Sequence, residues 1–207
     1  MIKFKLLCNG EFFVGIIISM RKIVLLMHVS LDGYVAGPNG EMDWIKLDDN
    51  LWDYVTSVTN DADAALFGAN TYKMMESYWP TADKQLGADK HDIDHAKWVN
   101  NVPKFVFSEK PIQTDWQGAK VIHDNIEKEM TALKEQPGKN LLILGSPSLA
   151  QSFMRLNLID EFRLNVNPVI LGEGKKLFDN IHQPINLSLV STQVFESGVL
   201  AVTYNKL

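Results

Sequence analysis

Two stretches of the chain combine a short apolar run, a glycine and polar residues in an order that suits anion binding. In the first, the apolar run 141–144 is followed by Gly145, Ser146 and Pro147. Ser146 is predicted to cap a helix, and Pro147 suits its first turn because a missing N–H costs nothing there. Such a turn leaves free N–H groups at the positive end of a helix, where a phosphate can bind. A capped helix without a ligand fits this stretch equally well when it is taken alone.

The second stretch repeats this order of strand, glycine, polar cap and helix. The apolar run 64–67 ends at Gly68, and Asn70 is predicted to cap a helix over 71–78, which ends before Pro80. Two helix N-termini of this kind can hold the two ends of a pyrophosphate. The pair of stretches therefore indicates a site for a phosphorylated ligand.

A glycine-rich loop follows the first predicted core strand. Residues 23–29 form a nearly continuous apolar run, which is typical of a central strand covered on both faces. Residues 30–40 contain Asp-Gly, Gly-Pro and Asn-Gly pairs, which predict a loop. Its glycines permit close approach to a ligand, so the loop could line a pocket. The alternative is a surface loop whose glycines only satisfy turn geometry.

Metal and redox chemistry find little support in the sequence. His91 and His95 stand four residues apart on a predicted helix and could in principle hold a metal. Their neighbours do not match a zinc-protease pattern and no third ligand is evident, so we interpret them as part of a solvated face and predict no metal site. The single cysteine, Cys8, excludes an internal disulfide and a CxxC motif, which fits a reducing cytoplasm.

The composition predicts one globular domain. With 207 residues, of which 46% are hydrophobic, the chain can bury one sizeable core. Its formal net charge of -5, without a basic cluster, argues against nucleic acid or an anionic membrane as partner. Residues 1–19 are interrupted by Asn9-Gly10-Glu11, which disfavours a signal peptide, and they are too short to span a bilayer. We expect residues 20–207 to form the domain and residues 1–19 to be an extension, with an extra hairpin as one possibility.

The remaining pattern predicts an α/β fold. Further helices are expected at 49–59, 82–101 and 124–136, and further strands at 104–108, 121–122 and 159–166. Residues 187–195 and 199–204 alternate in the period of strands around the turn 196–198, which predicts an antiparallel hairpin. Because strands alternate with helices before this hairpin, the sheet should be mostly parallel with the hairpin at one edge.

Five motifs in order carry a resemblance to a known family. They are His-Val-Ser-Leu-Asp-Gly-Tyr-Val-Ala-Gly-Pro at 28–38, Ala-Leu-Phe-Gly-Ala-Asn-Thr-Tyr at 65–72, Leu-Gly-Ser-Pro-Ser-Leu at 144–149, Leu-Ile-Asp-Glu-Phe at 158–162 and Pro-Val-Ile-Leu-Gly-Glu-Gly-Lys-Lys-Leu-Phe at 168–178. From residue 20 onward the chain resembles the dihydrofolate reductase-like family, and within it the C-terminal reductase domain of riboflavin biosynthesis enzymes. The resemblance implies a three-layer fold, NADPH as cofactor, reduction of a small heterocycle, and a homodimer.

The resemblance also implies roles for individual residues. The implied cofactor-binding residues are Gly68, Asn70, Thr71, Ser108, Lys110, Gly145, Ser146, Pro147, Ser148 and Leu149. Ser108 and Lys110 sit where the family contacts the 2′-phosphate. Asp32 is the implied catalytic residue, where a carboxylate could bond ring N–H groups or manage a proton, while a turn residue capping its own backbone is the alternative. Gly33, Tyr34 and Glu173 join Asp32 on the substrate side. Relatives usually carry Arg where this chain has Ala69.

The functional hypothesis is an NADPH-dependent reductase that transfers a hydride to a dihydrofolate-like or 5-amino-6-(5-phosphoribosylamino)uracil-like substrate. The alternative is a nucleotide-binding or regulatory module of the same fold without turnover, which the missing Arg at Ala69 would permit. NADPH should be preferred over NADH, because the chain lacks the G-x-G-x-x-G fingerprint and has Lys110 near the expected 2′-phosphate.

Overall fold

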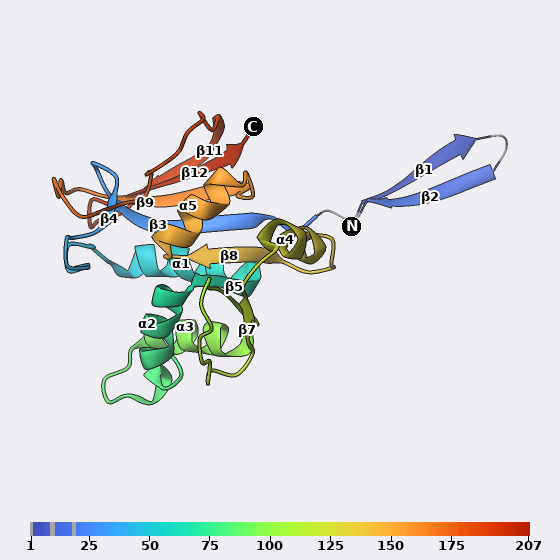
Figure 1. The fold of residues 1–207 in the computed structure, drawn as a ribbon. Helices are drawn as coiled ribbons and strands as arrows, with labels where there is room; N and C mark the ends of the chain where they lie inside the picture. Colours follow the sequence, from blue (N-terminus) through green and yellow to red (C-terminus); the bar gives the residue numbers. More distant parts are fainter. Residues whose placement is uncertain (1, 9–10, 18–19) are drawn as a thin grey trace.

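An eight-stranded sheet in the order β11-β12-β9-β3-β8-β5-β6-β7 forms the centre of the fold (Figure 1). The computed structural model describes residues 2–8, 11–17 and 20–207, and side chains from residue 20 onward. The strands of this sheet are β3 (Ile23–Ser30), β5 (Ala62–Gly68), β6 (Lys104–Phe107), β7 (Ala119–Ile122), β8 (Asn140–Leu144), β9 (Glu161–Asn167), β11 (Leu187–Val194) and β12 (Leu200–Lys206). The helices are α1 (Asp49–Asn60), α2 (Ala69–Tyr78), α3 (Lys90–Asn101), α4 (Ile126–Lys134) and α5 (Pro147–Arg155).

The predicted topology is confirmed. Strands β9, β3, β8, β5, β6 and β7 run parallel, whereas β12 pairs antiparallel with β9 and β11 pairs antiparallel with β12. The C-terminal hairpin therefore lies at one edge of a mostly parallel sheet, as expected. The parallel strands share one direction because each is followed by a crossover that returns the chain to the same end of the sheet.

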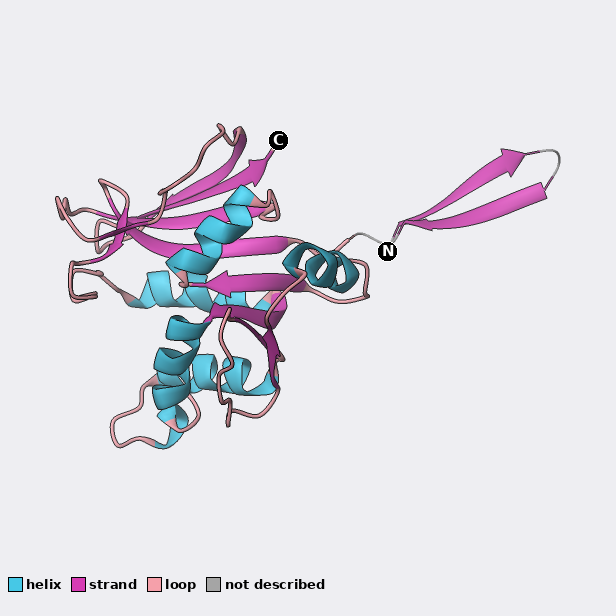
Figure 2. Ribbon diagram, in the orientation of Figure 1, coloured by secondary structure: helices cyan, strands magenta, loops and turns pink. Residues whose placement is uncertain are grey.

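Helices cover both faces of the sheet, as Figure 2 shows in cyan. Alternate residues of β3 point to opposite faces, so Ile23 and Leu25 join one core while Val24 and Leu26 join the other. The first core lies against α4 and α5, and the second lies against α1, α2 and α3. Each fully buried aliphatic side chain contributes about 1.5–3 kcal/mol. None of the helices in the described part of the chain is long and apolar enough to cross a membrane.

Two smaller sheets complete the structure. Strand β4 (Tyr34–Ala36) pairs antiparallel with β10 (Lys175–Lys176), so part of the predicted loop 30–40 forms a short strand. Strands β1 (Ile2–Cys8) and β2 (Glu11–Ile17) pair with each other in a sheet of their own, which confirms the hairpin considered for the N-terminal residues. Residues 1, 9–10 and 18–19 of the predicted extension lie outside the described residues.

Three predicted helix starts were wrong. Asn70 lies inside the first turn of α2, whose N-cap is Gly68. The helix expected over 82–101 is split into a 3-10 turn at Ala82–Lys84 and α3, because Asp89 forms a capping box with Asp92 and so begins a new helix. Helix α4 starts at Ile126 after Asn125, which adopts a left-handed conformation, so Asp124 does not cap it.

The solvated-face interpretation of the two histidines was also wrong. His95 is buried, with its ring 4.2 Å from the ring of Trp79 and 5.6 Å from that of Trp98. His91 stacks on Trp52 at 5.5 Å. Trp52 and Trp79 come from other segments of the chain, so this face of α3 packs inside the fold instead of facing solvent. Within the described ranges, no group of three or more His, Cys, Asp or Glu side chains is placed to hold a metal.

Candidate active site

The predicted site residues lie where the parallel strands end. Because β3, β8, β5 and β6 are parallel, their carboxyl ends meet at one edge of the sheet, at the left of Figure 1. Helices α2 and α5 begin at this edge, directly after β5 and β8. Since β5 pairs with β8, the two helix N-termini are neighbours. A crevice at the carboxyl ends of strands is the usual ligand site of open α/β sheets.

A hydrogen bond joins the two helix starts. The backbone N–H of Gly68 donates to Oγ of Ser146 at 2.9 Å, and Ser146 is only 3% exposed. Ser146 occupies the N-cap position of α5 as predicted, but its backbone is left-handed, with φ at 57°, and its hydroxyl does not cap its own helix. Its side chain therefore serves the neighbouring segment.

Both helix N-termini remain without a side-chain cap. Gly68 has no side chain to cap α2, and the hydroxyl of Ser146 accepts no hydrogen bond from the first turn of α5. The first turns of α2 and α5 also contain no acidic residue. The other three helices carry acidic first-turn residues, which are Asp49 in α1, Asp92 in α3, and Glu127 and Glu129 in α4. The uncapped N–H groups of α2 and α5 can therefore attract an anion without repulsion from a nearby carboxylate.

The two segments pack against each other closely. A Cβ at Gly68 would lie 3.7 Å from Cβ of Leu149, and a Cβ at Gly145 would lie 3.8 Å from Cγ2 of Thr71. Gly145 needs its glycine because its φ is +65°. The structure thus brings together Gly68, Thr71, Gly145, Ser146 and Leu149 from the two predicted stretches.

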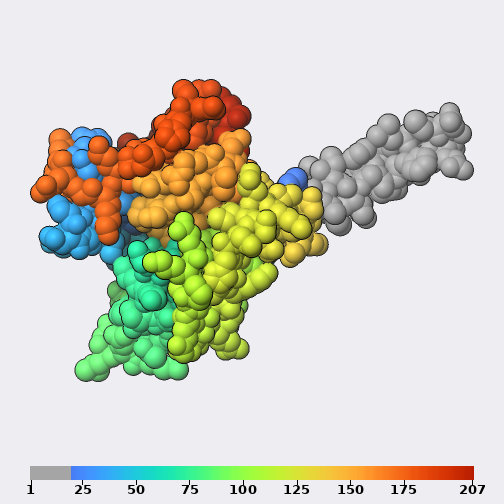
Figure 3. Space-filling view, in the orientation of Figure 1, coloured from blue at the N-terminus to red at the C-terminus, as the bar shows by residue number. Residues whose placement is uncertain are grey.

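A cleft of about 640 Å³ opens beside the start of α5. Its lining includes Tyr34, Pro147, Ser148, Gln151, Glu173 and Lys176. In Figure 3, the blue loop after β3 and the orange loop before β10 lie together on this side of the molecule. The volume is in the range of small-molecule sites. Gln151 and Lys176 were not predicted, because nothing in their local sequence marks them as lining a cleft.

Asp32 anchors the loop that forms one wall of this cleft. Its Oδ1 accepts hydrogen bonds from Oγ of Ser30 at 2.6 Å and from the N–H of Leu171 at 3.1 Å, and its Oδ2 accepts one from the N–H of Gly172 at 2.8 Å. The Ser30 hydroxyl, together with these backbone donors, lowers the pKa of Asp32 to about 2. The carboxylate is therefore ionised at neutral pH, where it can accept hydrogen bonds but has no proton to donate.

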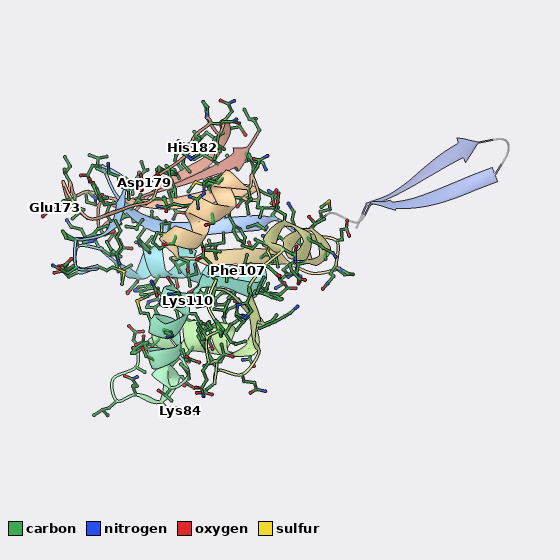
Figure 4. The ribbon with its side chains drawn as sticks, viewed as in Figure 1. Lys84, Phe107, Lys110, Glu173, Asp179 and His182 are labelled. Carbon is green, nitrogen blue, oxygen red and sulfur yellow. The ribbon has the colours of Figure 1, made fainter. Side chains whose placement is uncertain are left out.

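The other predicted substrate-side residues meet at the same loop. The hydroxyl of Tyr34 donates to the carbonyl of Gly172 at 3.1 Å, and the carbonyl of Gly33 accepts from the N–H of Leu177 at 2.9 Å. A Cβ at Gly174 would overlap the carbonyl oxygen of Ala36, so the β4–β10 contact requires glycine there. Glu173 is exposed on the wall of the cleft, and Figure 4 labels it at this edge.

Ser108 and Lys110 follow β6, next to β5. Oγ of Ser108 donates to the carbonyl of Lys110 at 2.6 Å, so this hydroxyl already has a partner in its own turn. The Lys110 side chain is exposed. The far end of the loop is fixed by Glu76, whose Oε1 accepts from the N–H groups of Asp115 and Trp116, each at 3.0 Å. The role of Ser108 and Lys110 in binding a 2′-phosphate stays a prediction.

Sequence reasoning missed a buried polar pair near the end of β3. Nδ2 of Asn165 lies 3.4 Å from Nε2 of His28, while Nδ1 of His28 and Oδ1 of Asn165 are buried without a hydrogen-bond partner. Burial lowers the pKa of His28 to about 4. The available signal was a histidine within the otherwise apolar run 23–29.

Comparison with known proteins places the chain in a family. The model of the RibD C-terminal domain matches residues 21–201. The uncharacterized protein YyaP of Bacillus subtilis is 38% identical over 190 residues, which cover 91% of this chain and 96% of YyaP. A putative riboflavin biosynthesis protein from Shewanella sp. PV-4 has a TM-score of 0.70 at 22% identity, covering 90% of this chain and 99% of its own. Dihydrofolate reductase from Enterococcus faecalis, complexed with NADP(H), has a TM-score of 0.58 at 16% identity, covering 89% and 96% of the two chains. The protein therefore belongs to the RibD C-terminal domain family and has the dihydrofolate reductase-like fold.

Proposed function

We propose that this protein is an NADPH-dependent reductase of a small planar heterocycle, either dihydrofolate-like or 5-amino-6-(5-phosphoribosylamino)uracil-like. One observation carries the proposal. The N-termini of α2 and α5 are both uncapped, both free of acidic residues in the first turn, and linked by the bond from Gly68 to Ser146. Two adjacent helix starts of this kind match the two phosphates of a dinucleotide better than a single anion.

The residues present fit such a cofactor. The glycines at 68 and 145 leave the backbone accessible where the diphosphate would lie, and the hydroxyl of Ser148 is exposed at the start of α5. When bound, NADPH supplies the hydride, and the protein contributes position and charge. Asp32 holds the loop at Leu171 and Gly172, which forms the wall opposite α5. The carboxylate of Glu173 lines the same cleft and can accept hydrogen bonds from the ring N–H groups of a heterocycle.

Lys110 is proposed to read the 2′-phosphate that distinguishes NADPH from NADH. Its ammonium is exposed, and one partly exposed contact to phosphate should give roughly ten- to thirtyfold discrimination. Lys110→Ala should weaken NADPH binding by that factor and leave NADH nearly unchanged, with a smaller gap at high salt. Lys84→Ala is a matched control, because Lys84 is also exposed but lies far from Lys110 in Figure 4. Equal loss of both cofactors in the Lys110 variant would contradict this role.

The second candidate function is cofactor binding without turnover. It is favoured by Ala69, which provides no cation in the first turn of α2. Titration of NADPH, followed by assays with dihydrofolate and with a ribosylaminouracil phosphate, separates the two functions. Ligand at ~100 times its dissociation constant should stabilise the fold by about 2.7 kcal/mol. Absence of NADPH binding contradicts both functions, whereas binding without oxidation of NADPH on either substrate favours the second.

A further inference from the structure

An apolar pocket lies on the α5 face of the sheet, apart from the candidate active site. It is formed by the C-terminal half of α5, by β9, by the start of β11 and by the connector 177–186, which joins β10 to β11. Its volume is about 390 Å³, and its apolar lining includes Met154, Phe162, Phe178, Ile181, Ile185 and Leu187. None of its lining residues also lines the active-site cleft. In Figure 4, His182 marks the connector and lies apart from Glu173 at that cleft.

The pocket opens into a wider groove whose rim carries two cations. This groove has a volume of about 840 Å³, shares Met154 and Ile181 with the pocket, and continues to Arg155 and Lys206. Arg155 is exposed at the end of α5, and Lys206 is half-buried at the end of β12. Among the described residues that line the groove, none is Asp or Glu. The site therefore has an apolar interior and a basic mouth.

The two cations at the mouth have no acidic partner in the part of the chain that the structure describes. The other two arginines each form an ion pair with a carboxylate. Arg155 instead donates to Oγ of Ser152 at 2.9 Å, and Nζ of Lys206 donates to the carbonyl of Asn157 at 2.7 Å. Arg155 is in the last turn of α5, where a cation favours the helix dipole, but this effect explains neither Lys206 nor the apolar pocket.

We propose that this groove is a second ligand site, which binds an amphipathic monoanion such as a medium-chain or aromatic carboxylate. The apolar body of the ligand would fill the pocket, and its carboxylate would lie at Arg155 and Lys206. An uncharged apolar ligand would leave both cations unused, and an inorganic anion would gain nothing from the apolar walls. The volume is in the range of small-molecule sites, and a guanidinium can bind a carboxylate through two hydrogen bonds.

The test uses the full-length protein with the fluorescent probe 1-anilinonaphthalene-8-sulfonate and with octanoate. Each combines an apolar body with one anionic group. The probe should bind saturably, with one probe per chain, and octanoate should displace it. Octanol has the same chain length without the charge, so it should displace the probe roughly tenfold less well. High salt should reduce this difference, because exposed charges are screened.

Two pairs of variants separate the charge from the apolar pocket. Arg155→Glu should raise the dissociation constant of the probe by roughly tenfold or more, because repulsion replaces attraction. Lys128→Glu is its matched control, since Lys128 is exposed on α4 and its replacement changes the net charge equally. Ile181→Trp should also weaken binding, because the larger side chain fills the pocket, whereas Ile93→Trp at an exposed position of α3 should not.

Several results would overturn the proposal. These are a lack of saturable probe binding, equal displacement by octanoate and octanol, or equal dissociation constants within either pair of variants. Displacement of the probe by NADPH would place the probe in the candidate active site instead. A probe affinity that falls as the protein concentration rises would assign the groove to a second copy of the chain. Circular dichroism of each variant shows whether the fold is intact, so that a loss of binding is not a loss of structure.

Discussion

Replacing Ser146 with Ala should destabilise the protein by about 1–3 kcal/mol, because it leaves the N–H of Gly68 without an acceptor. The position is 3% exposed, so water cannot easily replace the hydroxyl. The left-handed backbone at φ 57° costs Ala about as much as Ser, so strain adds nothing to the difference. For a chain of 207 residues, each 1 kcal/mol lowers the Tm by roughly 2–4 °C.

Two further variants separate the hydrogen bond from the backbone strain. Ser146→Gly loses the same bond but relieves the left-handed strain, so it should be about 1 kcal/mol more stable than Ser146→Ala. Ser148→Ala is the matched control, because Ser148 is an exposed serine two residues later in the same helix start. Urea unfolding at pH 7 measures all three. If Ser146→Ala and Ser148→Ala unfold at the same urea concentration, the bond to Gly68 contributes nothing and the proposed link between the helix starts fails.

Three other predictions follow from the structure. Asp32→Asn should lower turnover with NADPH by roughly one to two orders of magnitude, the scale of a lost hydrogen bond to a charged group, because the uncharged amide anchors the loop at Leu171 and Gly172 less firmly; an unchanged kcat would contradict this. Burial lowers the pKa values of His28 and His95 from 6.5 to about 4, so stability should be complete above pH 6.5 and fall between pH 6.5 and 4 by up to about 3 kcal/mol for each group. Urea unfolding at pH 7 and at pH 4.5 tests whether the free energy of unfolding falls at the lower pH. His95→Phe should partly remove this pH dependence. Gly174→Ala should disrupt the β4–β10 pair and not the main sheet, so hydrogen exchange should rise in β4 and β10 alone.

Local sequence determined the elements and their order. The apolar residues of the run 23–29 are buried in β3, because such a run needs cover on both faces. The alternation before and after 196–198 gave the antiparallel hairpin at the sheet edge. The glycines at 68 and 145 mark the ends of two parallel strands, which must share one edge. Those local patterns were sufficient to predict a mostly parallel α/β sheet with the hairpin at one edge.

The tertiary structure alone decided which groups at that edge are already paired. The N–H of Gly68 meets the hydroxyl of a serine 78 residues away, and Asp32 bonds to backbone 139 and 140 residues away. His95 was expected in solvent but is covered by Trp79 and Trp98. Periodicity reports which face of an element is apolar, and it contains no information on which distant segment will cover a polar residue. A hydrogen bond between loops depends on strand order and register, which are set by the packing of the whole sheet.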